Sequence, residues 1–479
     1  MRFAVIVRFI GIIILINALF LLVSGLISLF GSETSTIPLL FTTFVTTAIG
    51  VFPVILVPRR DDISLFEGMS IVVGGWIVTG LIGALPYFMW GGEFTFVNAW
   101  FESVSGYTTT GASILNNIEV VPDGLLFWRA STHFIGGVGV ILFALVILPM
   151  AAGSKMVLFN FEVSNMAKDN LRYRTKYAMQ VILFVYIFLG FTETLLLWAG
   201  GMSFFDAVCH SFATISTGGF STKNASVAFY DSFYIESVIV VFMFLSGVHF
   251  GLLFETFRLK KDNIFNSPVV KYYFFSVLIA FLFMAAKLVF SSNFTWATAL
   301  RVSAFQSVSI GTSTGFATTD TNLWPVFNQF ILIFLSLQCA CAGSTTSGIK
   351  CDRMVVMFKG IRQQIKYLQH PNAVSVIKIK NTVVSQDIVS RIGIFVFVFL
   401  IILVVSTFLL TLFNIDLLTS FSACLATLSN VGPGFGMVGS VNNYSALPDA
   451  VKIILSINML LGRLEIFGFI SLFFIRSWK

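Results

Sequence analysis

A short segment of small hydroxyl or amide residues that ends in glycine occurs four times along the chain. Because glycine adopts positive φ at little cost, such segments can turn successive backbone carbonyls toward one axis. Rings of backbone carbonyls replace the hydration shell of K⁺ in known channels. The four segments, termed filter segments below, therefore predict K⁺-binding residues within a single polypeptide. They are Thr109-Thr110-Gly111, Ser216-Thr217-Gly218, Ser313-Thr314-Gly315 and Asn430-Val431-Gly432, with Gly111, Gly218, Gly315 and Gly432 as the matched glycines.

Each filter segment follows an apolar stretch that is too short to cross a bilayer and precedes one that is long enough. A spanning helix needs about 20 predominantly apolar residues. Non-helical backbone at membrane depth is tolerated only where it is buried in protein or lines a watery cavity. An internal repeat of this kind predicts four pseudo-symmetric helix–pore loop–helix units around one ion pore. The short helices are expected at 97–107, 204–215, 295–309 and 417–428.

Two further apolar stretches precede the first repeat, so that ten spans are expected in all. They are 4–30 and 37–57, 68–90 and 128–152, 177–200 and 232–256, 269–291 and an interrupted span from about 325, and 388–414 and 448–475. The chain accordingly divides into two N-terminal transmembrane helices (1–62), pore repeat 1 (63–160), pore repeat 2 (161–262), pore repeat 3 with an intramembrane gating loop (263–380) and pore repeat 4 (381–479).

The composition predicts an all-α polytopic membrane protein. Hydrophobic residues make up 57% of the chain and charged residues only 11%, with a formal net charge of +7. Most Lys and Arg residues fall on one side of the expected spans, which the positive-inside rule makes the cytoplasmic side. Both termini lie on that side, and the placement of the basic residues excludes a nucleic-acid partner. The five cysteines lack the spacing of a zinc site.

Acidic residues outnumber basic ones in the loops on the opposite side, among them Glu93, Glu102, Asp206 and Asp320. An excess of negative charge at a pore mouth concentrates cations and raises their rate of arrival. The sequence therefore predicts an acidic outer vestibule. The alternative, ordinary solvated loop charge, applies to any single carboxylate more readily than to the whole set.

The second span of repeat 3 contains a run of small or helix-weakening residues. Glycine in a helix costs roughly 1 kcal/mol relative to alanine, and broken helices in transporters cluster along substrate pathways. The run predicts an intramembrane gating loop just below the filter segments, and the alternative is a plain cytoplasmic loop. The loop residues are Ala342, Gly343, Ser344, Thr345, Thr346, Ser347 and Gly348, followed by Lys350.

Arg463 lies deep in the last expected span. An ionisable residue at such a depth commonly costs 2.5–3.5 kcal/mol on insertion scales and is a functional candidate by default. Arg463 could hold the gating loop through its carbonyls or repel cations from the lower pore, and the alternative is a structural pair with Glu465 or another carboxylate. His133 lies beside a glycine run, which in an apolar span favours close helix packing over a nucleotide-binding loop.

With these motifs the sequence resembles the TrkH/KtrB/HKT superfamily of potassium transporters over nearly its whole length, and the two N-terminal helices resemble the TrkH branch. The resemblance extends to the filter segments, the gating loop and the Arg463-Leu464-Glu465 motif. It implies uptake of K⁺, and of Rb⁺ as a surrogate, across a bacterial inner membrane by a homodimer. It also implies regulation by a cytoplasmic, nucleotide-binding Trk-type ring protein, with no cofactor bound by this chain. Plant-type relatives with serine in the first filter segment are associated with Na⁺, so Gly111 argues for K⁺.

Two transport mechanisms remain open from the sequence. The first is a K⁺-selective channel-like pore, and the second is a K⁺ symporter coupled to Na⁺ or H⁺, for which Glu193 or Glu465 could serve as a coupling site. An intramembrane enzyme would need a paired nucleophile and base, a metal constellation or an aspartate dyad within the spans. The sequence contains none of these, and we expect no enzymatic activity.

Overall fold

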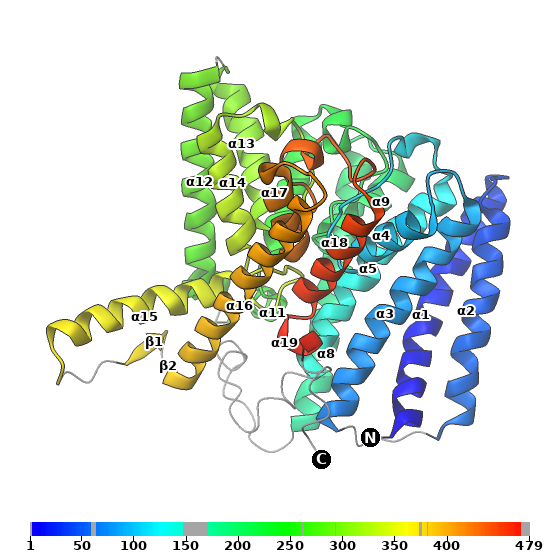
Figure 1. Cartoon of the computed structure of the whole chain (residues 1–479), viewed down its shortest axis with the longest axis horizontal. Helices are drawn as coiled ribbons and strands as arrows, with labels where there is room; N and C mark the ends of the chain where they lie inside the picture. Colours follow the sequence, from blue (N-terminus) through cyan, green and yellow to red (C-terminus); the bar gives the residue numbers. More distant parts are fainter. Residues whose placement is uncertain are drawn as a thin grey trace.

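Helices dominate the computed structural model of the chain, which describes residues 2–58, 64–146, 171–260, 263–292, 294–372, 376–380 and 382–470. The ends of two expected spans, beyond 146 and beyond 470, lie outside these residues. The longer helices run roughly side by side (Figure 1). They are α1 (Phe3–Phe30), α2 (Thr36–Leu56), α3 (Leu65–Trp90), α5 (Asp123–Val146), α8 (Leu171–Ala199), α10 (Phe233–Ser246), α12 (Pro268–Ser292), α14 (Val326–Gln338), α16 (Gln386–Thr411) and α18 (Asp449–Arg463).

Ten expected spans correspond to six continuous spanning helices and four that are bent, short or only partly described. In the described part of the chain, α1, α2, α3, α8, α12 and α16 are long and apolar enough to cross a membrane. The pair formed by α10 and α11 (Phe250–Phe257) adds a seventh span if its two helices count as one. The helices α14 and α18 contain only 13 and 15 residues, and α5 contains 24.

The prediction of a continuous span over 232–256 is wrong, because α10 and α11 meet at an angle of 106°. At the bend, the carbonyl of Gly247 accepts a hydrogen bond from the Cys341 N–H (3.0 Å). The Phe250 N–H in turn donates to the carbonyl of Gly343 (3.3 Å). The bend therefore satisfies its free backbone groups through the interrupted span of repeat 3, as buried backbone requires.

The last span is also broken, which the sequence did not predict. Helix α18 ends at Arg463, and after a three-residue turn the short helix α19 (Phe467–Ile470) begins. Glu465 and Ile466 both adopt positive φ in this turn (52° and 53°). Non-glycine residues rarely adopt such a conformation without support from their surroundings.

Four short helices match the expected pore helices: α4 (Phe96–Tyr107), α9 (Phe204–Ile215), α13 (Trp296–Gly311) and α17 (Leu417–Leu428). At 1.5 Å per residue, the 12 residues of α4 cover about 18 Å, which is well short of the ~30 Å hydrocarbon core. Each helix starts at a side-chain cap that accepts the N–H three residues later, a common device at helix N-termini. The four caps are Thr95, Ser203, Thr295 and Asp416.

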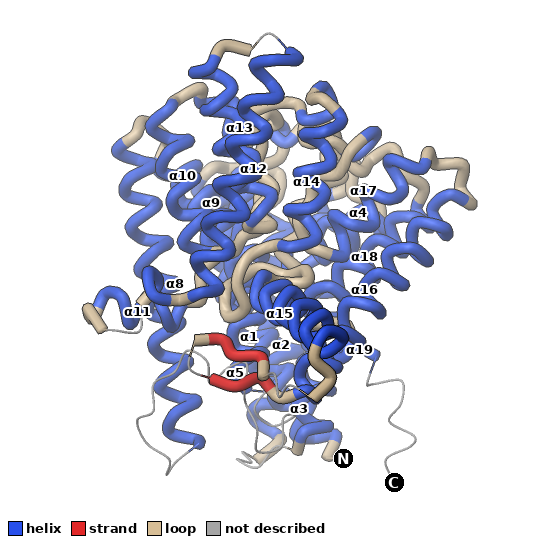
Figure 2. Tube along the Cα trace, turned by 90° about the vertical axis from the view of Figure 1, so that its left-hand side faces the viewer, coloured by secondary structure: helices blue, strands red, loops and turns tan. Residues whose placement is uncertain are grey.

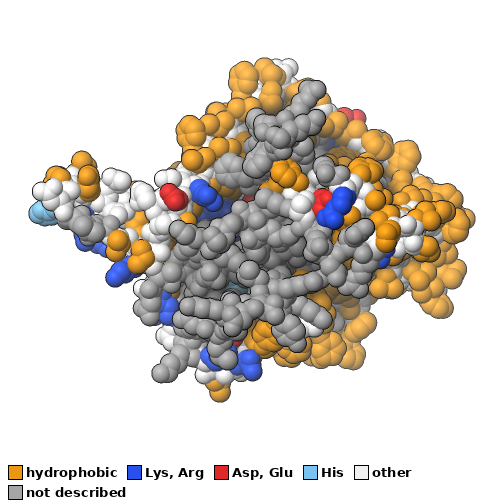
Figure 3. Space-filling view, turned by 90° about the horizontal axis from the view of Figure 1, so that it is seen from below, with side chains coloured by type: hydrophobic (Ala, Val, Ile, Leu, Met, Phe, Trp, Pro, Cys, Tyr) orange, Lys and Arg blue, Asp and Glu red, His pale blue; other side chains and the backbone are white. Residues whose placement is uncertain are grey.

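An arm extends from the body on the side where α1 begins (Figures 1 and 2). It consists of α15 (Cys351–Gln369) and the antiparallel hairpin of β1 (Ile377–Ile379) and β2 (Thr382–Val384). Val356 of α15 packs against Ile377 and Val384 of the hairpin in a small apolar cluster. Seen from below, the arm carries Lys and Arg side chains beside hydrophobic ones (Figure 3). The sequence analysis predicted neither this helix nor the hairpin.

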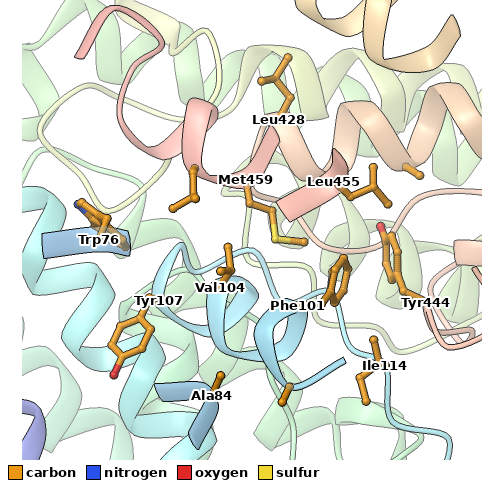
Figure 4. Packing of buried hydrophobic residues seen from close by; sticks show 14 of the residues in the cluster. Trp76, Ala84, Phe101, Val104, Tyr107, Ile114, Leu428, Tyr444, Leu455 and Met459 are labelled. Carbon is orange, nitrogen blue, oxygen red and sulfur yellow. The ribbon is translucent and has the colours of Figure 1, made fainter. Parts of the chain in front are cut away.

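The largest apolar cluster joins the N-terminal helices to repeats 1 and 4. Figure 4 shows Phe101 and Val104 of α4 packed beside Leu455 and Met459 of α18. All four side chains are buried. This packing fixes one pore helix against the broken last span, and so relates the first filter segment to Arg463.

Candidate ion pathway

The four pore helices end in the same backbone motif. The residue after each C-cap has positive φ: Thr109 (52°), Thr217 (55°), Ser313 (56°) and Asn430 (53°). The N–H of the next residue then donates to a carbonyl five positions back, as from Thr110 to Ser105 (2.9 Å). Equivalent bonds of 2.7–2.9 Å begin at Gly218, Thr314 and Val431. This is the Schellman arrangement, and it turns the chain sharply out of each helix.

A second positive φ follows two residues later, at a glycine in every repeat. The values are 79° at Gly111, 80° at Gly219, 83° at Gly315 and 96° at Gly432. Gly218 is absent from the positive-φ glycines. The expected match of Gly218 with Gly111 is therefore wrong by one residue, because two adjacent glycines follow Thr217 and the sequence pattern was aligned on the first.

With this correction, the second filter segment is Thr217-Gly218-Gly219. Ser216 is the C-cap of α9, and its hydroxyl donates to the carbonyl of Phe212 (2.7 Å). Ser216 thus occupies the position of Thr108 in the first repeat, which is the C-cap of α4. It belongs to the helix end rather than to the filter segment.

The four filter segments contact one another in a closed cycle. A Cβ placed on Gly111 would lie only 2.1 Å from the Gly218 carbonyl oxygen. The same construction gives 1.9 Å from Gly219 to the Thr314 oxygen, 2.1 Å from Gly315 to the Val431 oxygen, and 2.5 Å from Gly432 back to the Thr110 oxygen. The segments of repeats 1 to 4 therefore follow one another around a common centre. We call the carbonyl oxygens of Thr110, Gly218, Thr314 and Val431 the carbonyl ring.

Side-chain hydrogen bonds connect the filter segments to the ends of the pore helices, to one another and to α18. The Thr110 hydroxyl lies 2.7 Å from that of Thr108, and the Thr314 hydroxyl lies 2.8 Å from that of Thr312. The Asn430 amide crosses from repeat 4 to donate to the Thr110 hydroxyl (2.9 Å) and to the Met459 carbonyl (3.0 Å). These bonds hold the side chains and leave the main-chain carbonyls of the segments as the groups that can replace water around an ion.

A buried ion pair braces the first two repeats. Arg129 Nε lies 2.5 Å from a carboxylate oxygen of Glu102, and both residues are buried. Glu102 also accepts from the Ile114 N–H (2.9 Å), and Arg129 donates to the Ser221 carbonyl (2.9 Å). The pair thus connects the loop residues that follow the first two filter segments. The prediction that Glu102 contributes charge to the outer vestibule is therefore wrong, because its carboxylate is buried and paired with Arg129.

Carboxylates lie at the N-terminal ends of two pore helices: Asp416 is exposed, whereas Asp206 is largely buried, with Lys223 Nζ 4.0 Å away. Asp416 caps α17, and its hydrogen bonds with Thr419 hold the pKa of its carboxyl group below the usual value. On α9, Asp206 accepts from the Thr222 hydroxyl at 2.5 Å. A carboxylate that is stabilised in its charged form stays ionised at neutral pH. These two side chains therefore contribute negative charge at this end of the pathway.

The interrupted span places its loop directly below the second filter segment. The Thr345 hydroxyl donates to the carbonyl of Ile215, the last residue of α9 (3.1 Å). Ser344, Thr345, Thr346 and Ser347 are each no more than 4% exposed. The alternative of a plain cytoplasmic loop is therefore wrong, because a loop of that kind would be exposed to solvent.

Arg463 contacts this loop and not Glu465. Its guanidinium donates to the carbonyl of Thr345 (2.6 Å) and to the hydroxyl of Ser347 (3.2 Å). A third bond reaches the carbonyl of Gly136 on α5 (3.3 Å). The alternative of a structural pair with Glu465 is wrong.

Glu465 instead binds the start of α15. Its carboxylate oxygens lie 2.7 Å from Lys350 Nζ and 2.6 Å from an Arg353 guanidinium nitrogen. Lys350 is the N-cap of α15 and has φ of 71°. The broken last span therefore contacts the gating loop at two places, through Arg463 at its centre and through Glu465 where α15 begins.

The described residues contain no group of three His, Cys, Asp or Glu side chains that could hold a metal ion. The five cysteines form no disulfide and are buried.

Comparison with known proteins identifies relatives over the full length of the chain. A family model described as TrkH, cation transport protein, matches residues 40–477. The Trk system potassium uptake protein TrkH of Escherichia coli K12 is 34% identical, with all of both chains covered. TrkI of Halomonas elongata, also named a Trk system potassium uptake protein, is 30% identical over 97% of its length. The crystal structure of the potassium transporter TrkH from Vibrio parahaemolyticus superposes over all of both chains, with a TM-score of 0.90 and 31% identity.

Proposed function

The chain belongs to the TrkH family of cation transport proteins, and on that premise we propose that it takes up K⁺, with Rb⁺ as a surrogate, through a channel-like pore. The closed cycle of filter segments is the observation that carries the proposal. Four carbonyls from one chain can surround a dehydrated ion without a second subunit. Inward flow would draw on the membrane potential, which is worth about 2.3 kcal/mol per charge per 100 mV.

The gating loop closes the pathway below the filter segments in this proposal. Its support is the buried position of Thr345 beneath α9 and its hydrogen bond from Arg463. The positive charge of Arg463 would also repel a cation that enters from below. Opening would require the loop to leave Arg463. Two hydrogen bonds join Arg463 to the loop, and a third joins it to Gly136 on α5.

The proposed setting is a bacterial inner membrane that the chain crosses several times, with both termini in the cytoplasm. The Lys and Arg residues of the α15 arm lie on the side where α1 begins, as the positive-inside rule expects (Figure 3). By family resemblance, the chain forms a homodimer, and a cytoplasmic nucleotide-binding ring protein regulates it. The Trk system names of the relatives support such a multicomponent assembly.

One observation favours the symporter as a second candidate. Glu193 on α8 is fully buried and has no cationic partner among the described residues, and the Thr214 hydroxyl near its carboxyl group already donates to the His210 carbonyl. An isolated buried carboxylate is costly unless it is paired or takes up a proton. A group of this kind could exchange a proton or a Na⁺ ion during transport.

The test is ⁸⁶Rb⁺ uptake into proteoliposomes, with competition by K⁺, Na⁺ and Li⁺. K⁺ alone should compete strongly. Uptake by Glu193→Gln, which cannot ionise, should equal that of the wild type if the pore is uncoupled. A loss of uptake in a folded Glu193→Gln protein, or a dependence of wild-type flux on a Na⁺ or H⁺ gradient, would support the symporter instead.

A further inference from the structure

Position 218 differs from its three counterparts in the carbonyl ring. Thr110, Thr314 and Val431 carry side chains, whereas the second segment has Gly218. Its φ is not in the left-handed region that favours glycine. The backbone conformation therefore gives no reason for the missing side chain, and the reason must lie in the surroundings.

An imidazole from α5 fills the space behind Gly218. A Cβ placed on this glycine would lie 2.4 Å from Cδ2, 2.5 Å from Cγ and 2.7 Å from Nε2 of His133. Real Cβ contacts are essentially never this short. His133 thus occupies the volume that a side chain at position 218 would take.

His133 also connects two repeats by hydrogen bonds. The Phe220 N–H donates to Nε2 (3.2 Å), so Nε2 is an acceptor. Nδ1 then carries the proton and donates to the carbonyl of Gly106 in the last turn of α4 (2.7 Å). The ring is fully buried and stacks on Phe220, with centroids 4.1 Å apart. Both nitrogens and one face of the ring are therefore used at the filter.

We propose that His133 is a positioning residue for ion selectivity. It replaces the side chain that the second filter segment lacks and holds this segment against the pore helix of repeat 1. The Gly218 carbonyl is the one that meets Gly111, so its position depends on the imidazole behind it. This inference rests on the proposed K⁺ pore and assigns a function to a residue outside the filter segments.

The first test measures the permeability ratio of K⁺ to Na⁺ from reversal potentials of purified protein in planar bilayers. His133→Ala removes both hydrogen bonds of the imidazole, and we expect the ratio to fall roughly tenfold, which corresponds to about 1.4 kcal/mol. Ser131→Ala, a buried hydroxyl on the same helix without a partner among the described residues, should keep the wild-type ratio. A wild-type ratio in folded His133→Ala would overturn the proposal.

The second test uses compensation, which a merely structural role would not produce. Gly218→Thr alone should abolish flux, because its side chain meets the imidazole. His133→Ala combined with Gly218→Thr restores a side chain to the emptied volume and matches the other repeats, so its ratio should exceed that of His133→Ala. A double variant no more selective than His133→Ala, or full flux in Gly218→Thr, would contradict the assignment. Failure of the K⁺ pore itself would appear separately, as a wild-type protein without preference for K⁺.

Discussion

At the scale of single residues, four glycines of the filter segments combine two requirements that no other residue meets: Gly111, Gly219, Gly315 and Gly432. Gly111 has φ of 79°, and a Cβ there would lie 2.1 Å from the Gly218 carbonyl oxygen. The left-handed conformation costs an L-residue about 1–2 kcal/mol, and the contact would add to this cost. A substitution at Gly111 must therefore displace the carbonyl ring.

Gly111→Ser should lower the preference for K⁺ over Na⁺ because the new Cβ pushes the Gly218 carbonyl away from its position. Competition of Na⁺ with ⁸⁶Rb⁺ uptake measures the change. Gly91→Ser is a matched control, since Gly91 also has positive φ (86°) but has nothing within 4 Å of its Cβ position. If Na⁺ inhibits ⁸⁶Rb⁺ uptake by Gly111→Ser no more strongly than uptake by Gly91→Ser, Gly111 is not part of the filter.

The Glu102–Arg129 pair shows how a buried charge depends on its partner. Breaking a buried ion pair by removing one member typically costs 3–5 kcal/mol, because the other charge is left without compensation. We expect Glu102→Gln to lower the thermal unfolding midpoint in detergent substantially. Glu119→Gln, which changes an exposed carboxylate nearby, should leave the midpoint unchanged. Equal midpoints for the two variants would show that the pair contributes little.

At the scale of elements, the proposed gate is the loop within one broken span, and a second broken span contacts it. The gating loop lies between α14 and α15, and the turn after α18 supplies Arg463 and Glu465 to it. Both breaks bring positively charged and polar groups below the filter segments. A change in either element should alter flux without altering selectivity.

Shortening the loop between Ala342 and Gly348 should raise the basal flux of ⁸⁶Rb⁺, because the shorter loop can no longer lie beneath α9. The permeability ratio of K⁺ to Na⁺ should stay at its wild-type value, since the filter segments are unchanged. A shortened protein that is folded but no faster than the wild type would argue against a gate. A change in the ratio would indicate that the loop also shapes the filter.

Local sequence signals predicted the elements that depend on local chemistry. The pore helices follow from apolar stretches that are too short to span a bilayer and precede the filter segments, and the loop between α14 and α15 follows from its small residues. The bends at Gly247 and Glu465 could not be predicted in this way. The first depends on hydrogen bonds to Cys341 and Gly343, and the second on charges of α15, and both partners lie far away in the sequence.

At the scale of the whole molecule, the two N-terminal helices stand outside the repeats but reach the filter region. The Tyr107 hydroxyl at the end of α4 donates to Asn17 Oδ1 on α1 (2.6 Å), and both residues are buried. Tyr107 is the last residue of α4, and only the C-cap Thr108 separates it from the first filter segment. Helix α1 therefore supports the pore through the C-terminal end of α4.

Asn17→Leu should destabilise the protein by about 1–3 kcal/mol because it leaves the Tyr107 hydroxyl buried without an acceptor. Tyr107→Phe removes the same bond from the other side. If the bond acts as a unit, the double variant should be less destabilised than the sum of the two single changes. Unfolding in detergent measures each value, and strict additivity would mean that the two helices are not coupled through this contact.

The central claim is that four filter segments of one chain replace water around a K⁺ ion at the carbonyl ring. Crystals of the protein grown with Rb⁺ in place of K⁺ test it directly through the anomalous scattering of Rb⁺. We expect a peak on the axis between the carbonyl oxygens of Thr110, Gly218, Thr314 and Val431. An ion-free ring in protein that transports ⁸⁶Rb⁺, with the Rb⁺ peak elsewhere in the molecule, would contradict the claim.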